Sequence, residues 1–185
     1  FFAPVIATIQ PQTSTAAIIN HSPEPFTGLF ICKIVDLNLN IIDEFKRPVS
    51  ASPSDIATIT LPQSFVKPLR PEECFVYIVL ENGETVISQN SFFYLPDKYI
   101  NWPAQKINVQ TERVDVHNWL LKLKTGCAIK DLCIDLPFDA DLNDNFFDLL
   151  TYETKTVKIE TDETIFCDDL SREISFVSVN SIFSA

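Results

Sequence analysis

The sequence predicts an all-β protein built from two tandem immunoglobulin-like β-sandwich domains. Apolar and polar residues alternate along many short segments, which is the period-two pattern of half-buried strands. Turn residues separate these segments at intervals of about 8–12 residues, as in sandwich and barrel folds. No stretch longer than ten residues holds the apolar spacing of an amphipathic helix, so helices are not expected to build either core.

The first half contributes seven candidate strands, at residues 5–9, 15–20, 29–37, 40–46, 56–61, 74–81 and 85–95. Residues 29–35 and 74–80 are almost continuously hydrophobic, which predicts central strands whose two faces are both covered. Asn82-Gly83 predicts a tight hairpin between the last two strands, because both residues tolerate positive φ angles.

The second half alternates more strictly. Its candidate strands lie around residues 107–109, 117–123, 132–136 and 157–159. Trp119 is in phase with Leu121 and Leu123, which predicts a core position for its indole ring. Residues 141–150 are expected to form a helical turn, with Asn143 or Asp144 as the cap.

The final strand breaks its own alternation. Ile174 and Phe176 share one parity, whereas Val177 and Val179 take the other. A one-residue β-bulge near Phe176 would turn all four side chains toward the core. The alternative is a strand that is covered on both faces.

A proline-marked linker divides the sequence. Residues 95–103 contain two prolines, which cannot donate to a sheet ladder, and a new alternating segment follows directly. We place the boundary near residue 102, giving domains 1–102 and 103–185. Tyr99 and Trp102 in this linker are expected to pack between the domains or, alternatively, to contact a carbohydrate.

Charge excludes some partners. The chain of 185 residues carries a formal net charge of -11, and Lys46-Arg47 is its longest basic cluster. Nucleic acids and anionic membrane surfaces are therefore not expected partners. No apolar run reaches the roughly 18–20 residues that a membrane span needs. The chain contains no Met and begins Phe1-Phe2, which indicates a processed or excised piece of a longer protein.

The five cysteines do not form a metal or redox motif. None has the Cys-x-x-Cys spacing, and the expected role of most is that of a small core residue; the five are Cys32, Cys74, Cys127, Cys133 and Cys167. A disulfide between Cys32 and Cys74 is the alternative, since it would tie two strands of the first domain together.

The candidate carboxylates lie in expected turns and strand edges. Solvent is expected to reach them there, so no desolvation would raise their pKa as a catalytic acid requires. They are Glu72, Glu73, Asp135, Asp139, Asp141, Asp144, Asp168 and Asp169. The series Asp139-x-Asp141-x-Asn143 begins like a calcium loop, but Asp144 and Leu150 stand where such a loop needs Gly and Glu. We therefore expect no metal site.

Other catalytic and modification motifs are weak. His21 and His117 have no nucleophile motif nearby, and no glycine-rich phosphate loop occurs, so we expect no catalytic residue and no cofactor. Asn20-His21-Ser22 is a formal glycosylation sequon of a kind that is common by chance.

Three segments resemble a known family, in the right order along the chain. They are Phe2-Ala3-Pro4-Val5, residues 88–98 followed by Trp102-Pro103, and the most specific stretch, residues 144–150 followed by 153–157. These segments are similar to the C-terminal immunoglobulin-like domains of family 2 glycoside hydrolases of the β-mannosidase type. Where that family often shows Pro-Gly after the leucines, this chain has Thr151-Tyr152, so its turn must differ or store strain.

The resemblance implies a parent enzyme that removes terminal β-mannose with retention, using two glutamates of a barrel domain, in a periplasmic, secreted or lysosomal setting. No position here matches the motifs of those glutamates. The chain is therefore expected to be a non-catalytic accessory part whose partner is the catalytic domain upstream. The alternative is a free-standing carbohydrate-binding or adhesive module that binds an oligosaccharide.

Overall fold

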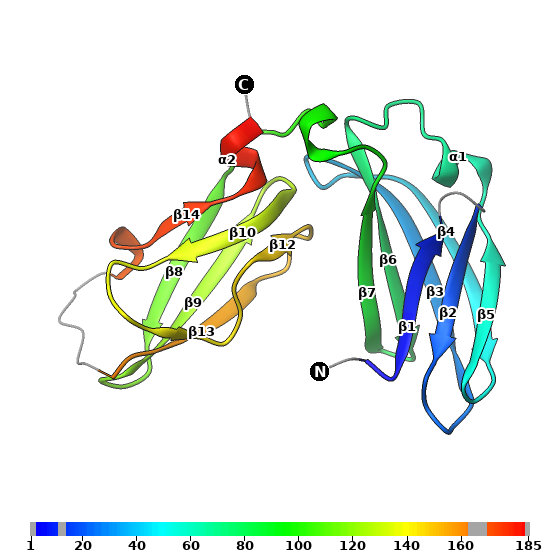
Figure 1. Ribbon diagram of the computed structural model, residues 1–185, viewed down its shortest axis with the longest axis horizontal. Helices are drawn as coiled ribbons and strands as arrows, with labels where there is room; N and C mark the ends of the chain where they lie inside the picture. Colours follow the sequence, from blue (N-terminus) through cyan, green and yellow to red (C-terminus); the bar gives the residue numbers. More distant parts are fainter. Residues whose placement is uncertain (1–2, 11–13, 163–169, 184–185) are drawn as a thin grey trace. The chain divides into compact units, whose positions relative to one another are not determined.

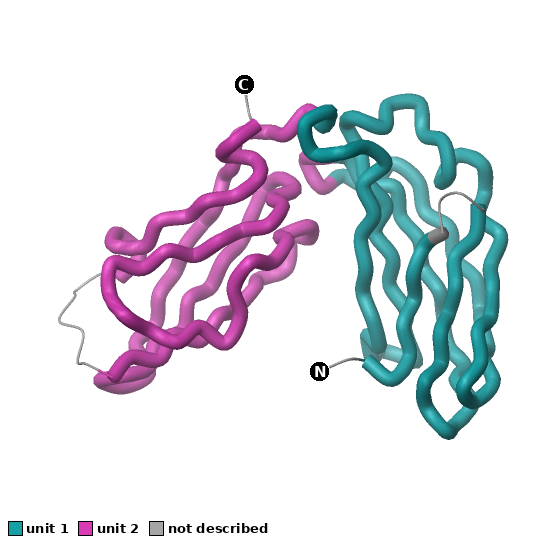
Figure 2. Tube along the Cα trace, viewed as in Figure 1, with its two compact units in different colours: residues 1–36, 40–100 teal, residues 37–39, 101–185 magenta. Residues whose placement is uncertain are grey.

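The computed structural model describes residues 3–10, 14–162 and 170–183, and antiparallel strands dominate them (Figure 1). The predicted all-β class is confirmed. Two compact units make up the chain: unit 1 comprises residues 1–36 and 40–100, and unit 2 comprises residues 37–39 and 101–185 (Figure 2). Each unit contains two sheets and its own apolar core.

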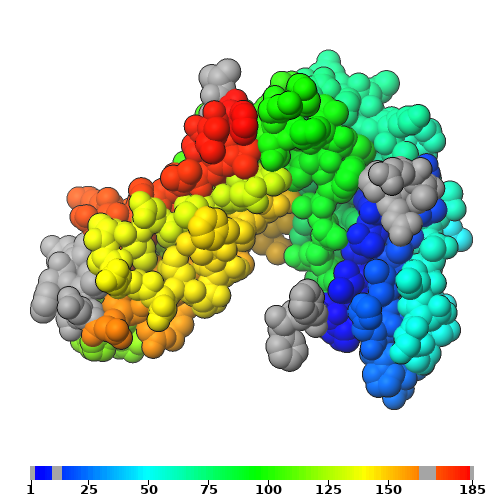
Figure 3. Space-filling view, viewed as in Figure 1, coloured from blue at the N-terminus to red at the C-terminus, as the bar shows by residue number. Residues whose placement is uncertain are grey.

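Unit 1 is a sandwich of a three-stranded and a four-stranded sheet. The smaller sheet has the order β1 (Val5–Gln10), β2 (Thr15–Asn20), β5 (Asp55–Thr60), and these strands lie side by side in Figure 3. The larger sheet has the order β4 (Ile41–Ala51), β3 (Phe26–Asp36), β6 (Cys74–Asn82), β7 (Thr85–Phe93). All seven strands were predicted, although α1 (Gln63–Val66) and the 3-10 turn η2 (Asp97–Tyr99) were not.

The central strands β3 and β6 are buried on both faces, as their continuous hydrophobic runs predict. One face contributes Phe30 and Leu80 to the main core of unit 1, and neither is exposed at all. On the opposite face, Ile31, Phe75 and Val79 are at most 6% exposed. Burial of both faces explains why these strands lack polar alternation.

Unit 2 also pairs two sheets. One has the order β12 (Phe147–Leu149), β10 (Ile129–Asp135), β14 (Ser175–Val177). The other has the order β11 (Asp141–Leu142), β13 (Lys155–Glu160), β9 (Asn118–Thr125), β8 (Ile107–Arg113). The 3-10 turn η3 (Leu170–Arg172) and α2 (Val179–Phe183) complete the described part. Trp119, Leu121 and Leu123 line the core, which confirms the predicted phase of β9.

The helical turn expected at residues 141–150 is wrong, because the segment forms β11 and β12 instead. Between them, the amide of Asn145 accepts the Ile134 N–H (2.8 Å) and donates to the Ile134 carbonyl (3.1 Å). The side chain thus replaces a ladder partner on β10. Asp148 accepts the Asp131 N–H at 2.9 Å, whereas Asp144 pairs with the Lys155 ammonium.

The turn in this segment takes positive φ at Phe146 (61°), and neither Thr151 nor Tyr152 has a positive φ. The turn therefore differs from the Pro-Gly pattern rather than straining Tyr152. Phe146 is 71% exposed, while Phe147 packs against the core of unit 2.

Both interpretations of the last strand are wrong. Ile174 and Phe176 face the core, but Val177 is 51% exposed and Val179 begins α2. The chain leaves the sheet because Asn180 fixes α2 against the backbone: it donates to the carbonyls of Pro103 (3.0 Å) and Ala128 (2.9 Å) and accepts the N–H of Lys130 (3.1 Å). These bonds replace further ladder pairing.

The predicted hairpin between β6 and β7 is present, with the turn moved by one residue. Asn82 pairs with Thr85, so Gly83 and Glu84 form the turn, and of these only Gly83 has positive φ (62°). Glycine at the first central position with positive φ is the pattern of a type II′ turn.

Gly83→Ala is expected to lower the free energy of unfolding of unit 1 by about 1 kcal/mol, because L-residues resist positive φ. No atom lies within 4 Å of an added Cβ, so the loss is purely conformational. Gly126→Ala is the control, since its site is equally open and lacks positive φ. Urea unfolding of both variants tests this; equal stabilities would contradict it.

Candidate functional site

The two residues singled out as contact residues lie in different environments. Tyr99 belongs to unit 1 and is 58% exposed, with the Lys98 ammonium 4.7 Å from its ring centroid. Trp102 belongs to unit 2 and is 4% exposed. An exposed ring such as that of Tyr99 can stack on a ligand, whereas a ring buried like that of Trp102 contributes mainly apolar packing.

The candidate carboxylates do not assemble into an acid–base pair in the described residues. Glu73 forms an ion pair with Arg70 (2.8 Å), Asp144 pairs with Lys155, and Asp135 accepts the Ser175 hydroxyl (3.0 Å). A glycosidase needs two carboxyl groups that face each other across a sugar bond. Asp168 and Asp169 lie outside the described residues.

The calcium-like series is part of the sheet. Asp141 lies on β11 opposite Glu160, and the Asn143 amide accepts the Lys158 N–H at 2.6 Å. Asn143 therefore holds β13 rather than an ion. Over residues 3–10, 14–162 and 170–183, no three His, Cys, Asp or Glu side chains gather in a group that could hold a metal.

A groove of about 500 Å³ lies in unit 1, beside α1 and the start of β4. Its apolar wall includes Ile42 and Leu69, which are 61% and 102% exposed. Asp36, Asp43 and Glu73 form part of its polar lining. The arrangement offers an apolar surface with acidic residues along its border.

The carboxylates of this groove are held by neighbours. Asp36 accepts the backbone N–H (2.8 Å) and the side-chain amide (2.9 Å) of Asn40. Asp43 accepts the Glu44 N–H (2.8 Å) and the Ser64 hydroxyl (3.3 Å). These bonds fix the orientation of both carboxylates in the lining of the groove.

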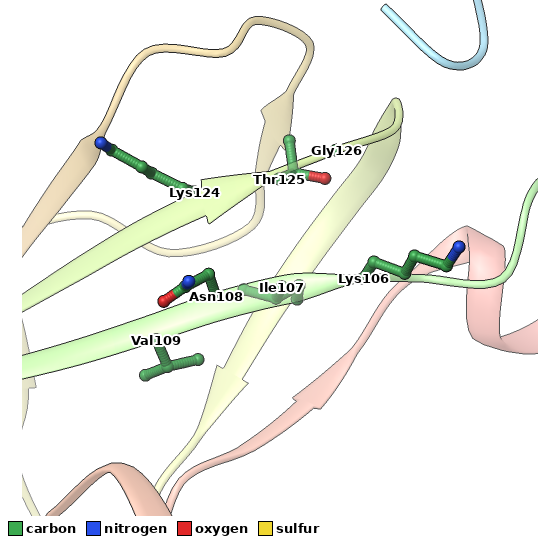
Figure 4. A pocket seen from close by; sticks show the side chains of 7 residues that line it. All are labelled: Lys106, Ile107, Asn108, Val109, Lys124, Thr125 and Gly126. Carbon is green, nitrogen blue, oxygen red and sulfur yellow. The ribbon is translucent and has the colours of Figure 1, made fainter.

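A second, open groove of about 640 Å³ follows β8 and β9 in unit 2 (Figure 4). Lys106, Asn108 and Lys124 line it, and the two lysine side chains point in different directions. Ile107 and Val109, also in the lining, pack against the core of unit 2. The groove contains no carboxylate, so it cannot supply the acid and base of glycoside hydrolysis.

The alternative of a Cys32–Cys74 disulfide is wrong, because both thiols are free. Cys32 pairs with Ile78, while Cys74 pairs with Asp36, four residues further along β3. Four residues of strand span roughly 13 Å, well beyond the separation that a disulfide bridges. Cys127 and Cys133 are also free, and Cys167 lies outside the described residues.

Burial changes the acidity of three groups in unit 1. Desolvation, with a smaller contribution from Asp43, raises the pKa of Cys32 to about 12. Desolvation, followed by the charges of Glu72 and Glu73, raises the pKa of Cys74 to about 11. Desolvation also raises the pKa of Tyr94, whose hydroxyl donates to the Phe65 carbonyl at 3.0 Å.

These shifts predict that unit 1 loses stability at high pH. Between the ordinary thiol pKa of 9.0 and the raised values, the unfolded chain releases protons that the folded chain retains, so stability falls as pH rises from about 9 towards 11. Urea unfolding at pH 7 and pH 10.5 measures the loss. A Cys32→Ala/Cys74→Ala variant should lose less of its own stability over this interval; an equal loss would contradict the assignment.

The class of fold is supported by solved structures. No family model matches the sequence, and no curated protein matches it. Solved structures do match, and in each case this chain spans about a quarter of the matched protein's length. At the identities involved, the likeness establishes the fold.

Two of these structures are glycoside-cleaving enzymes. The β-D-mannosidase of Dictyoglomus thermophilum matches with a TM-score of 0.69 and 15% identity, over 96% of this chain and 22% of that one. The exo-chitosanase of Amycolatopsis orientalis matches with a TM-score of 0.61 and 15% identity, over 96% of this chain and 26% of that one.

Sequence reasoning missed both grooves. The lining of the unit 1 groove comes from segments far apart in the chain: Ile34 on β3, Ser64 on α1 and Arg70 in the following connection meet there. Leu69, close to Glu72 and Glu73 in the sequence, was the available signal, because an exposed apolar residue next to acidic ones is typical of a binding surface.

Proposed function

We propose that this chain is a non-catalytic accessory part of a larger glycoside hydrolase of the β-mannosidase type. The likeness of 96% of the chain to a 22% portion of a β-D-mannosidase and a 26% portion of an exo-chitosanase carries this proposal. The chain corresponds in size to a structural portion of such enzymes. In this proposal, the catalytic domain of the same parent protein is its partner.

The sites described above support a structural role. Hydrogen bonds and ion pairs engage the carboxylates Asp36, Asp43, Glu73 and Asp144. These contacts fix the four side chains to neighbouring residues of this chain, which suits a structural role. The chemistry of the parent would then reside in glutamates outside this chain.

The specificity for β-mannose rests on the resemblance of residues 144–157 to the final domain of β-mannosidases. In this chain, that stretch forms β12 and the start of β13, fixed by Asn145 and Asp148 to β10. Residues 144–157 therefore stabilise unit 2. A similar stretch in β-mannosidases would stabilise a similar β-sandwich there. The proposal that the parent enzyme acts on β-mannosides depends only on this sequence resemblance.

The gene provides the first test. We expect the DNA upstream of the segment that encodes this chain to encode a barrel domain with an Asn-Glu acid/base motif. A second test uses the isolated chain, which should hydrolyse neither p-nitrophenyl β-D-mannoside nor p-nitrophenyl β-D-glucosaminide. An upstream region without a barrel, or turnover by the isolated chain, would contradict the proposal.

A glycan-binding assay separates the proposal from a free carbohydrate-binding module. Tyr99 is the exposed aromatic residue of the linker, so Tyr99→Ala should abolish sugar binding if the chain is such a module. Under our proposal, the native chain retains no oligosaccharide on a glycan array. Trp102→Phe is the matched variant, because its buried ring should affect stability rather than binding.

A further inference from the structure

The open edge of β4 is the feature of unit 1 that the proposed function leaves unexplained. β4 ends the larger sheet and pairs only with β3 among the described strands, along Phe26–Val35. At eleven residues, it is as long as β3, and eight of its residues are exposed. A long open edge presents unpaired backbone groups that can join another strand.

The other edge of this sheet is covered by side chains. On β7, the Ser88 hydroxyl accepts the Ala7 N–H (3.1 Å), and the Asn90 amide donates to the Ala7 carbonyl (3.4 Å). These bonds join β7 to β1 and close that side of the sandwich. The edge of β4 differs from that of β7 because, in the described part of the chain, no strand pairs with β4 on the side away from β3.

The residues of β4 that present free groups can be assigned from the ladder. Pro48 has no N–H, and the N–H of Glu44 is held by the carboxylate of Asp43 (2.8 Å) rather than by β3. Since backbone groups alternate sides along a strand, Glu44, Lys46 and Pro48 direct theirs away from β3. Lys46 can both donate and accept at the open edge, and Glu44 can do so once its N–H leaves the Asp43 carboxylate.

The charges along this edge are self-complementary. The order is Asp43, Glu44, Phe45, Lys46, Arg47: two acids, an aromatic residue and two bases. In an antiparallel pair centred on Phe45, Asp43 lies opposite Arg47 of the other strand and Glu44 lies opposite Lys46. Opposite charges directly across an antiparallel pair stabilise it.

We propose that β4 is a self-association edge, at which two copies of this chain pair their β4 strands antiparallel about Phe45 to form one continuous sheet. The twofold pairing joins Glu44 and Lys46 through four backbone hydrogen bonds, two on each side of the centre. In the pair, the Glu44 N–H leaves the Asp43 carboxylate, which faces Arg47 of the second copy instead. The ion pair between Lys46 and Glu44 within one strand (2.8 Å) is exchanged for the same pair between the two copies.

Only this register satisfies the charges. A shift of one strand by two residues moves the centre of the pair to residue 44 or to residue 46. The first shift places Glu44 opposite Glu44, and the second places Lys46 opposite Lys46. Like charges directly opposite each other are destabilising. Lysine and proline on an edge strand often prevent it from pairing with another strand. Lysine prevents two copies of one strand from pairing because the like charges repel each other. In β4 the acidic residues precede the basic ones, so an antiparallel copy places opposite charges together.

Sedimentation equilibrium of the 185-residue chain tests the proposal. A small strand-to-strand interface implies a weak complex, so the concentration series should extend to roughly 1 mM. The mass should rise from 21.0 kDa towards that of two copies. A monomer over the whole series would overturn the proposal.

Two complementary variants locate the interface. Lys46→Glu/Arg47→Asp makes the edge wholly acidic, and Asp43→Arg/Glu44→Lys makes it wholly basic. Each should associate at least tenfold more weakly than the native chain, whereas an equimolar mixture of the two should recover association. Native-like association of either variant alone, or a mixture that stays monomeric, would overturn the proposal.

Lys106→Glu/Lys124→Glu is the matched control, because it changes the net charge as much as the acidic variant does but on exposed residues of unit 2. It should associate like the native chain; a tenfold loss here would overturn the assignment to β4. Circular dichroism and urea unfolding establish that each variant is folded. If a double variant fails to fold, the single changes Lys46→Glu and Glu44→Lys make the same comparison at exposed positions.

Discussion

Replacing Trp119 with alanine should lower the free energy of unfolding of unit 2 by about 3–5 kcal/mol, which is the range for a large aromatic side chain in a core. Trp119 is 5% exposed near the start of β9, between Arg113 on β8 and Ile159 on β13. Its removal leaves a cavity that the surrounding strands can fill only by distorting two ladders.

Trp119→Phe should lower the free energy of unfolding of unit 2 much less than Trp119→Ala does. In the described part of the chain, the indole Nε1 of Trp119 is buried without a hydrogen-bond partner. Phenylalanine keeps most of the apolar surface and removes an unsatisfied donor, so the two effects partly offset each other. The Arg113 guanidinium, 5.6 Å from the indole ring, keeps an aromatic neighbour.

Urea unfolding with a fluorescence readout measures both effects. The two tryptophans belong to unit 2, so Trp102 reports on this unit when Trp119 is absent. Val114→Ala is the control because its side chain is 59% exposed, and we expect a change of no more than about 0.5 kcal/mol. A loss of less than about 1 kcal/mol for Trp119→Ala would show that the core does not depend on this ring.

The strands were predictable where burial follows a period of two. Trp119, Leu121 and Leu123 on β9 occur at alternate positions because one face of the sheet lies against the core. β3 was also predictable, for the opposite reason: both its faces are buried, so the strand is almost uniformly apolar. In these cases, the local pattern and the tertiary environment agree.

The elements that were mispredicted depend on side chains that bond to a distant backbone. Asn145 replaces a ladder partner of Ile134, which turns an expected helical turn into two short strands. Asn180 bonds to Pro103, 77 positions away, and ends the last strand early. An asparagine has the same local signature in a turn, a cap or a buried bridge, so the sequence alone could not separate these outcomes.

The candidate sites were less predictable than the fold. The acidic residues near the unit 1 groove were visible in the sequence, yet the groove depends on how the connection after β5 folds over β4. Ser64 on α1 contacts Asp43 on β4 (3.3 Å), and α1 itself is too short to leave a periodic pattern. The charge order of β4 was present in the sequence, but its meaning depends on β4 being an edge strand.

Asn20→Ala should lower the free energy of unfolding of unit 1 by about 2–4 kcal/mol, because a buried amide that bonds four backbone groups would be lost at once. The Asn20 side chain is 1% exposed and donates to the carbonyls of Glu24 (2.8 Å), Ala51 (3.3 Å) and Ser52 (3.1 Å). Its carbonyl oxygen accepts the Ser22 N–H at 2.9 Å. One amide therefore ties the end of β2 to the end of β4.

The same contacts determine whether Asn20 of the Asn20-His21-Ser22 sequon is accessible for glycosylation. Its amide nitrogen already donates to three carbonyls and is buried, so a folded chain cannot present it for glycosylation. The Ser22 hydroxyl also donates to Asn20 at 2.8 Å, which commits the sequon serine to the turn. A glycan attached before folding would have to displace these bonds.

Expression in a eukaryotic secretory host, followed by mass measurement, should therefore give a folded chain without a glycan at Asn20. Urea unfolding of Asn20→Ala, with the exposed Asn108→Ala as control, measures the structural effect. A folded, glycosylated chain of native stability would show that the amide is dispensable. Because the buried amide bonds backbone segments more than 30 residues apart, we expect the opposite: the sequon is a structural motif of the β2 turn.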